Sequence, residues 1–328
     1  MKRLALTAAI LIASGCPLVA KDHAAEQQLL DSAHKPADLF QRNGDPFDLE
    51  IDFIAQFKGS VPGHLSIKWQ TKDHWWSKVE FGGFEQILIT NGEMVYTSRN
   101  FNYTPTEVLN LFSLLSFGGK SPLRLIAQKE RDRTQDGISL ACVQAEQEIY
   151  VRDSHEFCLD LASRDLVSNE WQDQPVANKV VKKRQQFAGY VDFDGKRYPK
   201  KLELLENGVV VVSAIVTNLQ AAPFDPALLL PPKGAIERRM CPDIKPPRGI
   251  KESSPSFAGA GIPAGIIEMS LTILTDGSVG DIRITHSSGQ KADQIAIAAA
   301  RKVKYAPAMC GSEPVVSDLE VRYTFKMN

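Results

Sequence analysis

Apolar and polar residues alternate with a period of two from about residue 45 to residue 220. Between Phe47 and Phe57 every second side chain is apolar and most of the others are polar. This period predicts a strand of an antiparallel sheet that buries one face. Residue pairs that favour tight hairpin turns recur along the chain, at Asn91-Gly92, Asp136-Gly137, Asp194-Gly195, Asn207-Gly208 and Asp276-Gly277. We therefore expect a meander of antiparallel strands, with the apolar run from Val209 to Val216 buried on both sides.

One helix interrupts this pattern. The segment Thr104-Pro105-Thr106-Glu107 has the form of a capping box with proline at the first helical position. An apolar stripe follows and ends before Gly118-Gly119, and its residues are Val108, Leu111, Phe112 and Leu115. We expect this helix to lie across the open face of the curved sheet, and a second helix at about residues 26–40.

A different order of elements begins near residue 262. Two alternating segments, at 267–273 and 279–285, surround the Asp276-Gly277 turn. A helical period starts at Lys291, Pro307 prevents its continuation, and a final alternating segment runs from Leu319 to Phe325. This order predicts one helix on a three-stranded sheet. Because the last strand returns by a crossover, we expect one of its edges to be unpaired.

The segment between these regions is rich in proline and glycine from Pro231 to Gly249, and we expect it to break regular structure. The fold class predicted is α+β. It has a β-rich domain over residues 24–232, a linker over 233–261, and a small β-β-α-β domain over 262–328.

The first twenty residues resemble an export signal, with Lys2 and Arg3 before an apolar run from Leu4 to Ala13. The run is too short to span a bilayer comfortably. Its end can be read in two ways. Ala13-Ser14-Gly15-Cys16 resembles a bacterial lipobox, which would leave Cys16 lipidated, and the alternative is ordinary cleavage after Ala20.

Four cysteines remain beyond the signal, and an even number in an exported chain indicates disulfides with three possible pairings. Separation along the chain favours Cys142–Cys158 and Cys241–Cys310. The alternative is that some of these cysteines are buried free thiols.

Charge and motifs argue against several classes of function. The formal net charge of −1 gives no basic footprint for nucleic acid. The six histidines are scattered, no Gly-x-Ser-x-Gly is present, and Phe117 to Ser121 imitates a phosphate loop without its first glycine. We expect no catalysis, no cofactor and no metal.

The segments "TDGSV", "IRI", "SSG" and "AARKVKYAPA", in this order, resemble the TonB C-terminal domain over residues 262–328. The resemblance implies a periplasmic module that binds an extended peptide of an envelope or outer-membrane protein by strand addition. The implied contacts are Leu319, Val321, Tyr323 and Phe325. The alternative is an edge that Arg322 and Lys326 protect and that binds nothing. The upstream helix motif of the family survives only as "SPSFAGAGIPAG", and the membrane helix and proline-rich spacer of an energy-transducing TonB are missing.

The segments "FDGKRYPKKLELLENG" and "FCLDLASRDLV" look like hairpins of the LolA/LolB-type lipoprotein carriers. This weaker resemblance covers residues 40–230 and implies a half-open antiparallel barrel with a capping helix and an apolar cavity for acyl chains. The residues expected to line the cavity, unless they simply pack the core, are Phe53, Ile67, Trp69, Phe81, Leu111, Phe112 and Leu115.

Together these patterns predict a non-catalytic, exported envelope protein of the TonB family type that binds a partner through its C-terminal module. It would lack its own membrane-spanning, energy-coupling helix. The alternative is a periplasmic carrier of lipid or lipoprotein acyl chains in the N-terminal domain. Both hypotheses place the protein in the periplasm, attached to a membrane only if Cys16 is lipidated.

Overall fold

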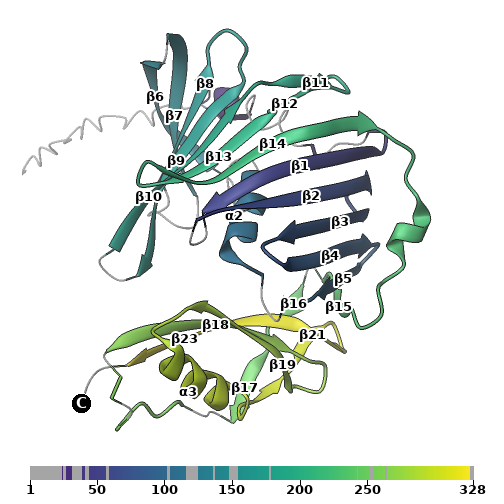
Figure 1. The fold of residues 1–328 in the computed structure, drawn as a ribbon, viewed down its shortest axis with the longest axis vertical. Helices are drawn as coiled ribbons and strands as arrows, with labels where there is room; N and C mark the ends of the chain where they lie inside the picture. Colours follow the sequence, from purple (N-terminus) through teal and green to yellow (C-terminus); the bar gives the residue numbers. More distant parts are fainter. Residues whose placement is uncertain are drawn as a thin grey trace, which may run out of the picture.

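The computed structural model describes residues 24, 27–31, 39–40, 44–56, 59–101, 104–115, 125–135, 137–147, 154–176, 179–241, 243–251, 254–259, 261–262 and 264–325. These residues form a large body built on one antiparallel sheet and a smaller C-terminal module below it in Figure 1. The export signal and Cys16 lie outside the described residues.

The large body contains a thirteen-stranded sheet in the order β15-β5-β4-β3-β2-β1-β14-β13-β10-β9-β8-β7-β6. Its strands are β1 Phe47–Gln56, β2 Ser60–Thr71, β3 His74–Phe81, β4 Phe84–Asn91, β5 Met94–Arg99, β6 Leu125–Gln135, β7 Ile138–Gln147, β8 Ser154–Asp160, β9 Leu166–Val176, β10 Lys179–Ala188, β13 Lys201–Glu206, β14 Val209–Ala221 and β15 Ile236–Arg239. A separate hairpin, β11 Val191–Phe193 with β12 Lys196–Tyr198, and the 3-10 helix η1 Pro226–Leu229 complete the body. The predicted antiparallel meander is confirmed, and β1 pairs with β14 to join its two halves.

The hairpin turns form where the dipeptides predicted them. Asp194 and Asn207 have φ values of 49° and 50°, and the glycine after each also has a positive φ. Such backbone matches the twist of the strands on either side of a two-residue turn. The local sequence therefore determines where these strands reverse.

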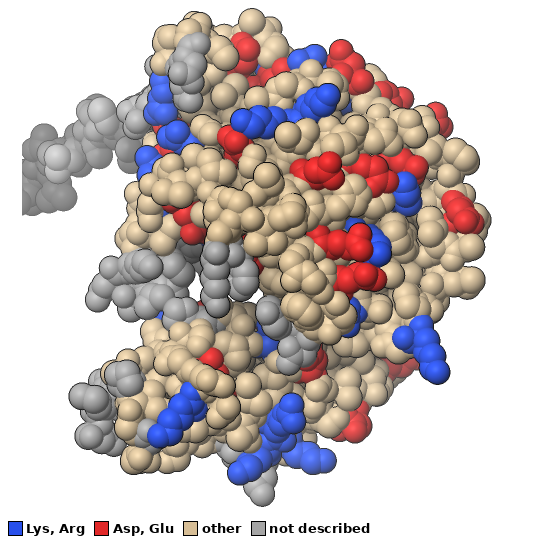
Figure 2. Space-filling view, in the orientation of Figure 1, with Lys and Arg blue, Asp and Glu red and all other residues tan. Residues whose placement is uncertain are grey.

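The prediction for Val209 to Val216 is wrong. Val212 and Ala214 are buried, but Val209 is 64% exposed and Ile215 is 48% exposed. Ile215 lies opposite Asp52 of β1, on the outer face of the sheet. Figure 2 shows acidic side chains gathered on this face, which explains why β14 can bury one side only. The run is apolar in composition but alternates in burial like its neighbours.

The helix α2, Thr106–Leu115, covers the inner face of the sheet, as predicted (Figure 1). It buries Val108, Leu111, Leu114 and Leu115 in the core. Two hydrogen bonds fix its ends. The Thr104 hydroxyl donates to Oε1 of Gln86 at 2.9 Å, and Nε2 of Gln185 donates to the carbonyl of Ser113 at 2.9 Å. The predicted stop at Gly118-Gly119 lies outside the described residues. Of the second predicted helix, residues 27–31 are helical, residues 39–40 form a turn, and the rest lies outside the described residues.

The C-terminal module confirms the predicted β-β-α-β order. Its elements are β18 Gly265–Ile273, β19 Val279–His286, α3 Gln290–Ala300 and β23 Ser317–Phe325, and its sheet has the order β19-β18-β23. Between α3 and β23 the chain adds three short strands that the sequence did not predict, β20 Lys304–Ala306, β21 Ala308–Cys310 and β22 Glu313–Val315. At the predicted turn Gly277 has a φ of 78°, and a Cβ there would overlap the carbonyl oxygen of Tyr305.

The segment predicted as a linker contains regular structure. The strand β15 pairs with β5, whereas β16 Ile244–Lys245 pairs with β21 and β17 Arg248–Lys251 pairs with β20. The expectation that proline and glycine break every regular element here is wrong, because strands of two to four residues fit between them at sheet edges. The segment is therefore bound to both bodies.

Both predicted disulfides are present. Cys142–Cys158 joins the paired strands β7 and β8, with 4.0 Å between the Cα atoms. Cys241–Cys310 joins the linker to β21, with 5.8 Å between the Cα atoms.

Candidate functional site

The strand β23 is the end strand of the module sheet. It pairs with β18 along its whole length, from Ile273 opposite Ser317 to Gly265 opposite Phe325. In the part of the chain that the structure describes, no strand pairs with its other side. The alternate backbone N–H and C=O groups on that side are therefore available for hydrogen bonds to another chain.

The four side chains expected to contact a partner point toward the module core. Leu319, Val321 and Tyr323 are half-buried against the core, and Phe325 is buried and stacks on Phe257 with 4.1 Å between ring centroids. Burial also raises the pKa of the Tyr323 hydroxyl, which stays neutral. These side chains fix the position of β23, so a partner would be held mainly by the backbone.

Two charged side chains of β23, Arg322 and Asp318, are bonded to residues outside that strand. Arg322 lies 3.4 Å from Glu268 of β18, measured from Nε to Oε1. Asp318 accepts hydrogen bonds from the Thr272 hydroxyl at 2.9 Å and from Nη2 of Arg238 at 3.0 Å. The pairing of Arg322 across the sheet argues against the alternative in which this residue blocks the edge. Lys326 lies outside the described residues.

The opposite end of the module sheet faces the large body. Asp281 of β19 forms an ion pair with Arg99 of β5, and both side chains are largely shielded from solvent. Arg239 of β15 bridges Glu93 at 3.0 Å and Glu313 at 2.6 Å. The first contact joins β19 to the large body, and the second joins β22 to β15. The start of β23 is also joined to β15, through Asp318 and Arg238.

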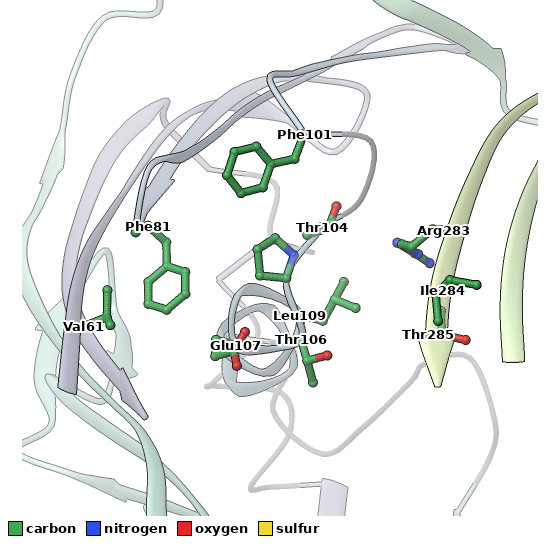
Figure 3. Close-up of a pocket in the computed structure, with 12 residues that line it drawn as sticks. Val61, Phe81, Phe101, Thr104, Thr106, Glu107, Leu109, Arg283, Ile284 and Thr285 are labelled. Carbon is green, nitrogen blue, oxygen red and sulfur yellow. The ribbon is translucent and has the colours of Figure 1, made fainter. Parts of the chain in front are cut away.

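The seven residues expected to line an acyl cavity lie in the core of the large body. Six are at most 6% exposed, and Phe112 is half-buried against them. Phe53 and Phe81 stack with 5.6 Å between ring centroids. Phe81 also lines a cavity of about 470 Å³, which lies between the large sheet, the start of α2 and β19 (Figure 3).

Sequence reasoning missed this cavity. Its walls combine Val61, Phe101 and Leu109 of the large body with Arg283 and Ile284 of the module. These residues are far apart in the sequence, and a local pattern does not show which of them meet. The one available signal was the alternation in β19, which puts Asp281, Arg283 and Thr285 on one face.

Neither a metal centre nor a membrane span is found in the described ranges. They hold no group of three or more histidine, cysteine, aspartate or glutamate side chains placed to bind a metal ion. Among these residues no helix has the length and apolar character needed to cross a membrane. His155, a buried histidine, is bonded to Asn169 at 2.9 Å and stacks on Trp171.

Comparison with known proteins identifies the C-terminal module. Residues 263–327 match the sequence model of the family described as Gram-negative bacterial TonB protein C-terminal. The match confirms the first resemblance and covers the module only. A comparison with curated protein sequences finds no match.

Several solved structures resemble about three fifths of the chain in fold. One is a LolA superfamily protein from Nitrosomonas europaea, with a TM-score of 0.42 and 11% identity, covering 62% of this chain and 96% of that one. Another is a putative outer membrane lipoprotein-sorting protein domain from Vibrio parahaemolyticus, with a TM-score of 0.41 and 11% identity, covering 61% and 94%. A DUF1329 family protein from Desulfovibrio piger has a TM-score of 0.42 and 11% identity, covering 63% and 96%.

Proposed function

We propose that this chain is an exported, non-catalytic protein of the bacterial envelope that binds an extended segment of a partner protein at β23. The observation that carries the proposal is the free edge of β23 in a module that matches the TonB C-terminal family. A partner segment would pair with the exposed backbone groups from Leu319 to Phe325 and extend the sheet order to four strands.

The way the edge is built supports this function. The side chains of Leu319, Val321 and Tyr323 are packed against the core, so the strand is already ordered before a partner arrives. A partner therefore loses its own conformational freedom, but β23 loses little, and this preorganisation favours binding. The periplasm is the proposed compartment.

We do not extend the proposal to acyl chains inside the large body. Six of the seven residues predicted to line such a cavity are buried in the core, and Phe112 is half-buried against it. Phe81 also borders the cavity beside β19.

Paired proline variants test strand addition. Successive residues of a strand direct their N–H groups to opposite sides, so Val321→Pro and Arg322→Pro remove one donor each from opposite sides of β23. One variant loses a hydrogen bond to β18, and the other loses a donor at the free edge. We expect the variant that loses the free-edge donor to keep the midpoint of its unfolding transition. The same variant should no longer capture the partner from envelope extracts. Full partner capture by both folded variants would contradict the proposal.

A further inference from the structure

The cavity between the two bodies has the properties of a small-molecule site. Its volume of about 470 Å³ falls within the range of about 300–1,000 Å³ that ligand pockets occupy. In Figure 3 the side chains of Val61, Phe81 and Phe101 lie on one side of the start of α2, and β19 with Arg283 lies on the other. A molecule in this space would contact both bodies at once.

Most of the lining is apolar. Val61, Phe81, Phe101, Leu109 and Ile284 present hydrocarbon surfaces to the space. Leu109 is 42% exposed although it lies on a helix that otherwise buries its leucines. An extended peptide would need a series of hydrogen-bond partners for its backbone. The lining offers three threonine hydroxyls, of which that of Thr104 already donates to Gln86, and the outer edge of β19 is unpaired among the described residues. The side chains that face the space are nevertheless mainly apolar. A hydrocarbon chain needs no hydrogen-bond partners, so the lining favours an alkyl group.

Arg283 supplies a positive charge at the β19 side of the same space. Its Nε is buried and has no hydrogen-bond partner among the described residues. No carboxylate in those ranges forms an ion pair with it, whereas Arg99, Arg238 and Arg239 each have one. A buried donor without a partner is costly, and a planar guanidinium matches the geometry of a carboxylate.

Among the described residues of the lining, Glu107 is the one carboxylate, and it lies on α2. Its negative charge disfavours an anionic head group beside the helix. The head group would therefore lie at Arg283 and the hydrocarbon would extend toward Phe81 and Val61.

We infer that the cavity between the large body and the module binds a long-chain alkyl carboxylate, with its carboxylate on Arg283 and its chain against the apolar wall. This inference goes beyond strand addition, because the site is on the β19 side of the module and does not use β23.

Equilibrium dialysis of the full exported chain against radiolabelled hexadecanoate, below its micelle concentration, tests the inference. We expect saturable binding, and weaker binding of dodecanoate by roughly fourfold for each methylene removed. Arg283→Gln should weaken hexadecanoate binding by about 10- to 100-fold because it removes a charge-assisted contact. Arg283→Lys should restore part of the affinity.

Matched control variants distinguish binding at the Arg283 cavity from general effects of a lost charge or of altered folding. Arg301→Gln changes an exposed arginine at the end of α3 and should leave binding unchanged. Leu109→Trp should reduce binding by filling the space, with little cost to folding because Leu109 is partly exposed. Methyl hexadecanoate should bind without sensitivity to Arg283→Gln. The proline variant of β23 that keeps its unfolding midpoint should bind hexadecanoate normally, so a failure of strand addition and a failure of this site are distinguishable.

Three results would overturn the inference. The first is the absence of saturable binding, and the second is equal binding by the parent, Arg283→Gln and Leu109→Trp proteins. The third is that the parent protein does not bind hexadecanoate but binds an apolar peptide, and that Arg283→Gln weakens this peptide binding.

Discussion

The two sheets of this protein differ in the strands that end them. In the large sheet, β5 is covered by β15, a short strand from the segment that connects the bodies. In the module, β23 has no such cover in the part of the chain that the structure describes. An uncovered edge risks unwanted pairing. At the β15 end the large sheet exposes a strand of only four residues, whereas β23 exposes nine. The longer edge of β23 is the one at which we propose that a partner binds.

The largest expected effect concerns the buried side of the large body. Leu111→Ala removes a fully buried side chain of α2 and should lower the free energy of unfolding of the large body by about 2–5 kcal/mol. Leu319→Ala on half-buried β23 should cost less, because fewer contacts are lost. Urea denaturation of both variants checks this, and equal losses would contradict the difference between the bodies.

The contact between the bodies should give the next largest effect. Arg99→Ala leaves Asp281 without its partner in a shielded position and should destabilise the junction by about 1–3 kcal/mol. The expected result is a separate, earlier unfolding transition for the module in calorimetry. Arg133→Ala, which breaks an exposed ion pair with Glu156 in the large sheet, serves as the control. A single unchanged transition in the Arg99→Ala protein would show that the contact does not couple the bodies.

Uncovering β5 should produce a smaller and more local effect. Ile236→Pro disturbs the pairing of β15 with Thr97 of β5. Met240 N–H donates to Glu93 in the same register, and bonded pairs alternate along an antiparallel ladder, so this change removes a hydrogen bond worth about 1 kcal/mol. Amide exchange of β5 should therefore accelerate by roughly fivefold, while the exchange of β18 stays the same. If β5 amides exchange at the parent rate, β15 is not what protects that edge.

The smallest expected effect is a pH dependence on the outer face of the large sheet. Burial opposes the charge on His64, but hydrogen bonds to Asp52 at 2.7 Å and Glu50 at 3.1 Å outweigh it and raise the pKa of the imidazole. The stabilisation is fully present below the ordinary pKa of 6.5 and is lost as the pH rises through the raised value. An NMR titration of His64 should show this, and Asp52→Asn should lower the pKa. A pKa of 6.5 or less in the parent would contradict the contacts.

The parts of the fold that the sequence predicts correctly are those determined by neighbouring residues. Asn207-Gly208 favours a hairpin turn by its own backbone preferences, and the stripe of α2 follows from helical spacing. Whether Ile215 is buried or exposed depends instead on what covers the outer face of the sheet, and its own neighbours in the sequence do not determine this. The strand β15 forms because β5 offers an edge, which lies more than a hundred residues earlier in the chain.

The same distinction applies to the candidate sites. The free edge of β23 follows from the order of elements, so sequence reasoning could find it. The cavity at Arg283 depends on the packing of two bodies against each other, and nothing near Arg283 in the sequence identifies Phe101 as its neighbour.

The disulfide between Cys241 and Cys310 determines how the chain would respond to mechanical tension. If a partner seated on β23 were pulled away from the large body, tension would pass from the last strand through the sulfur–sulfur bond directly to residue 241. The 69-residue interval between the two cysteines, which includes β18, β19 and α3, would not be drawn out between the points of attachment. At about 3.3–3.6 Å for each extended residue, the crosslink removes roughly 230 Å of possible extension from the segment that holds β18, β19 and α3.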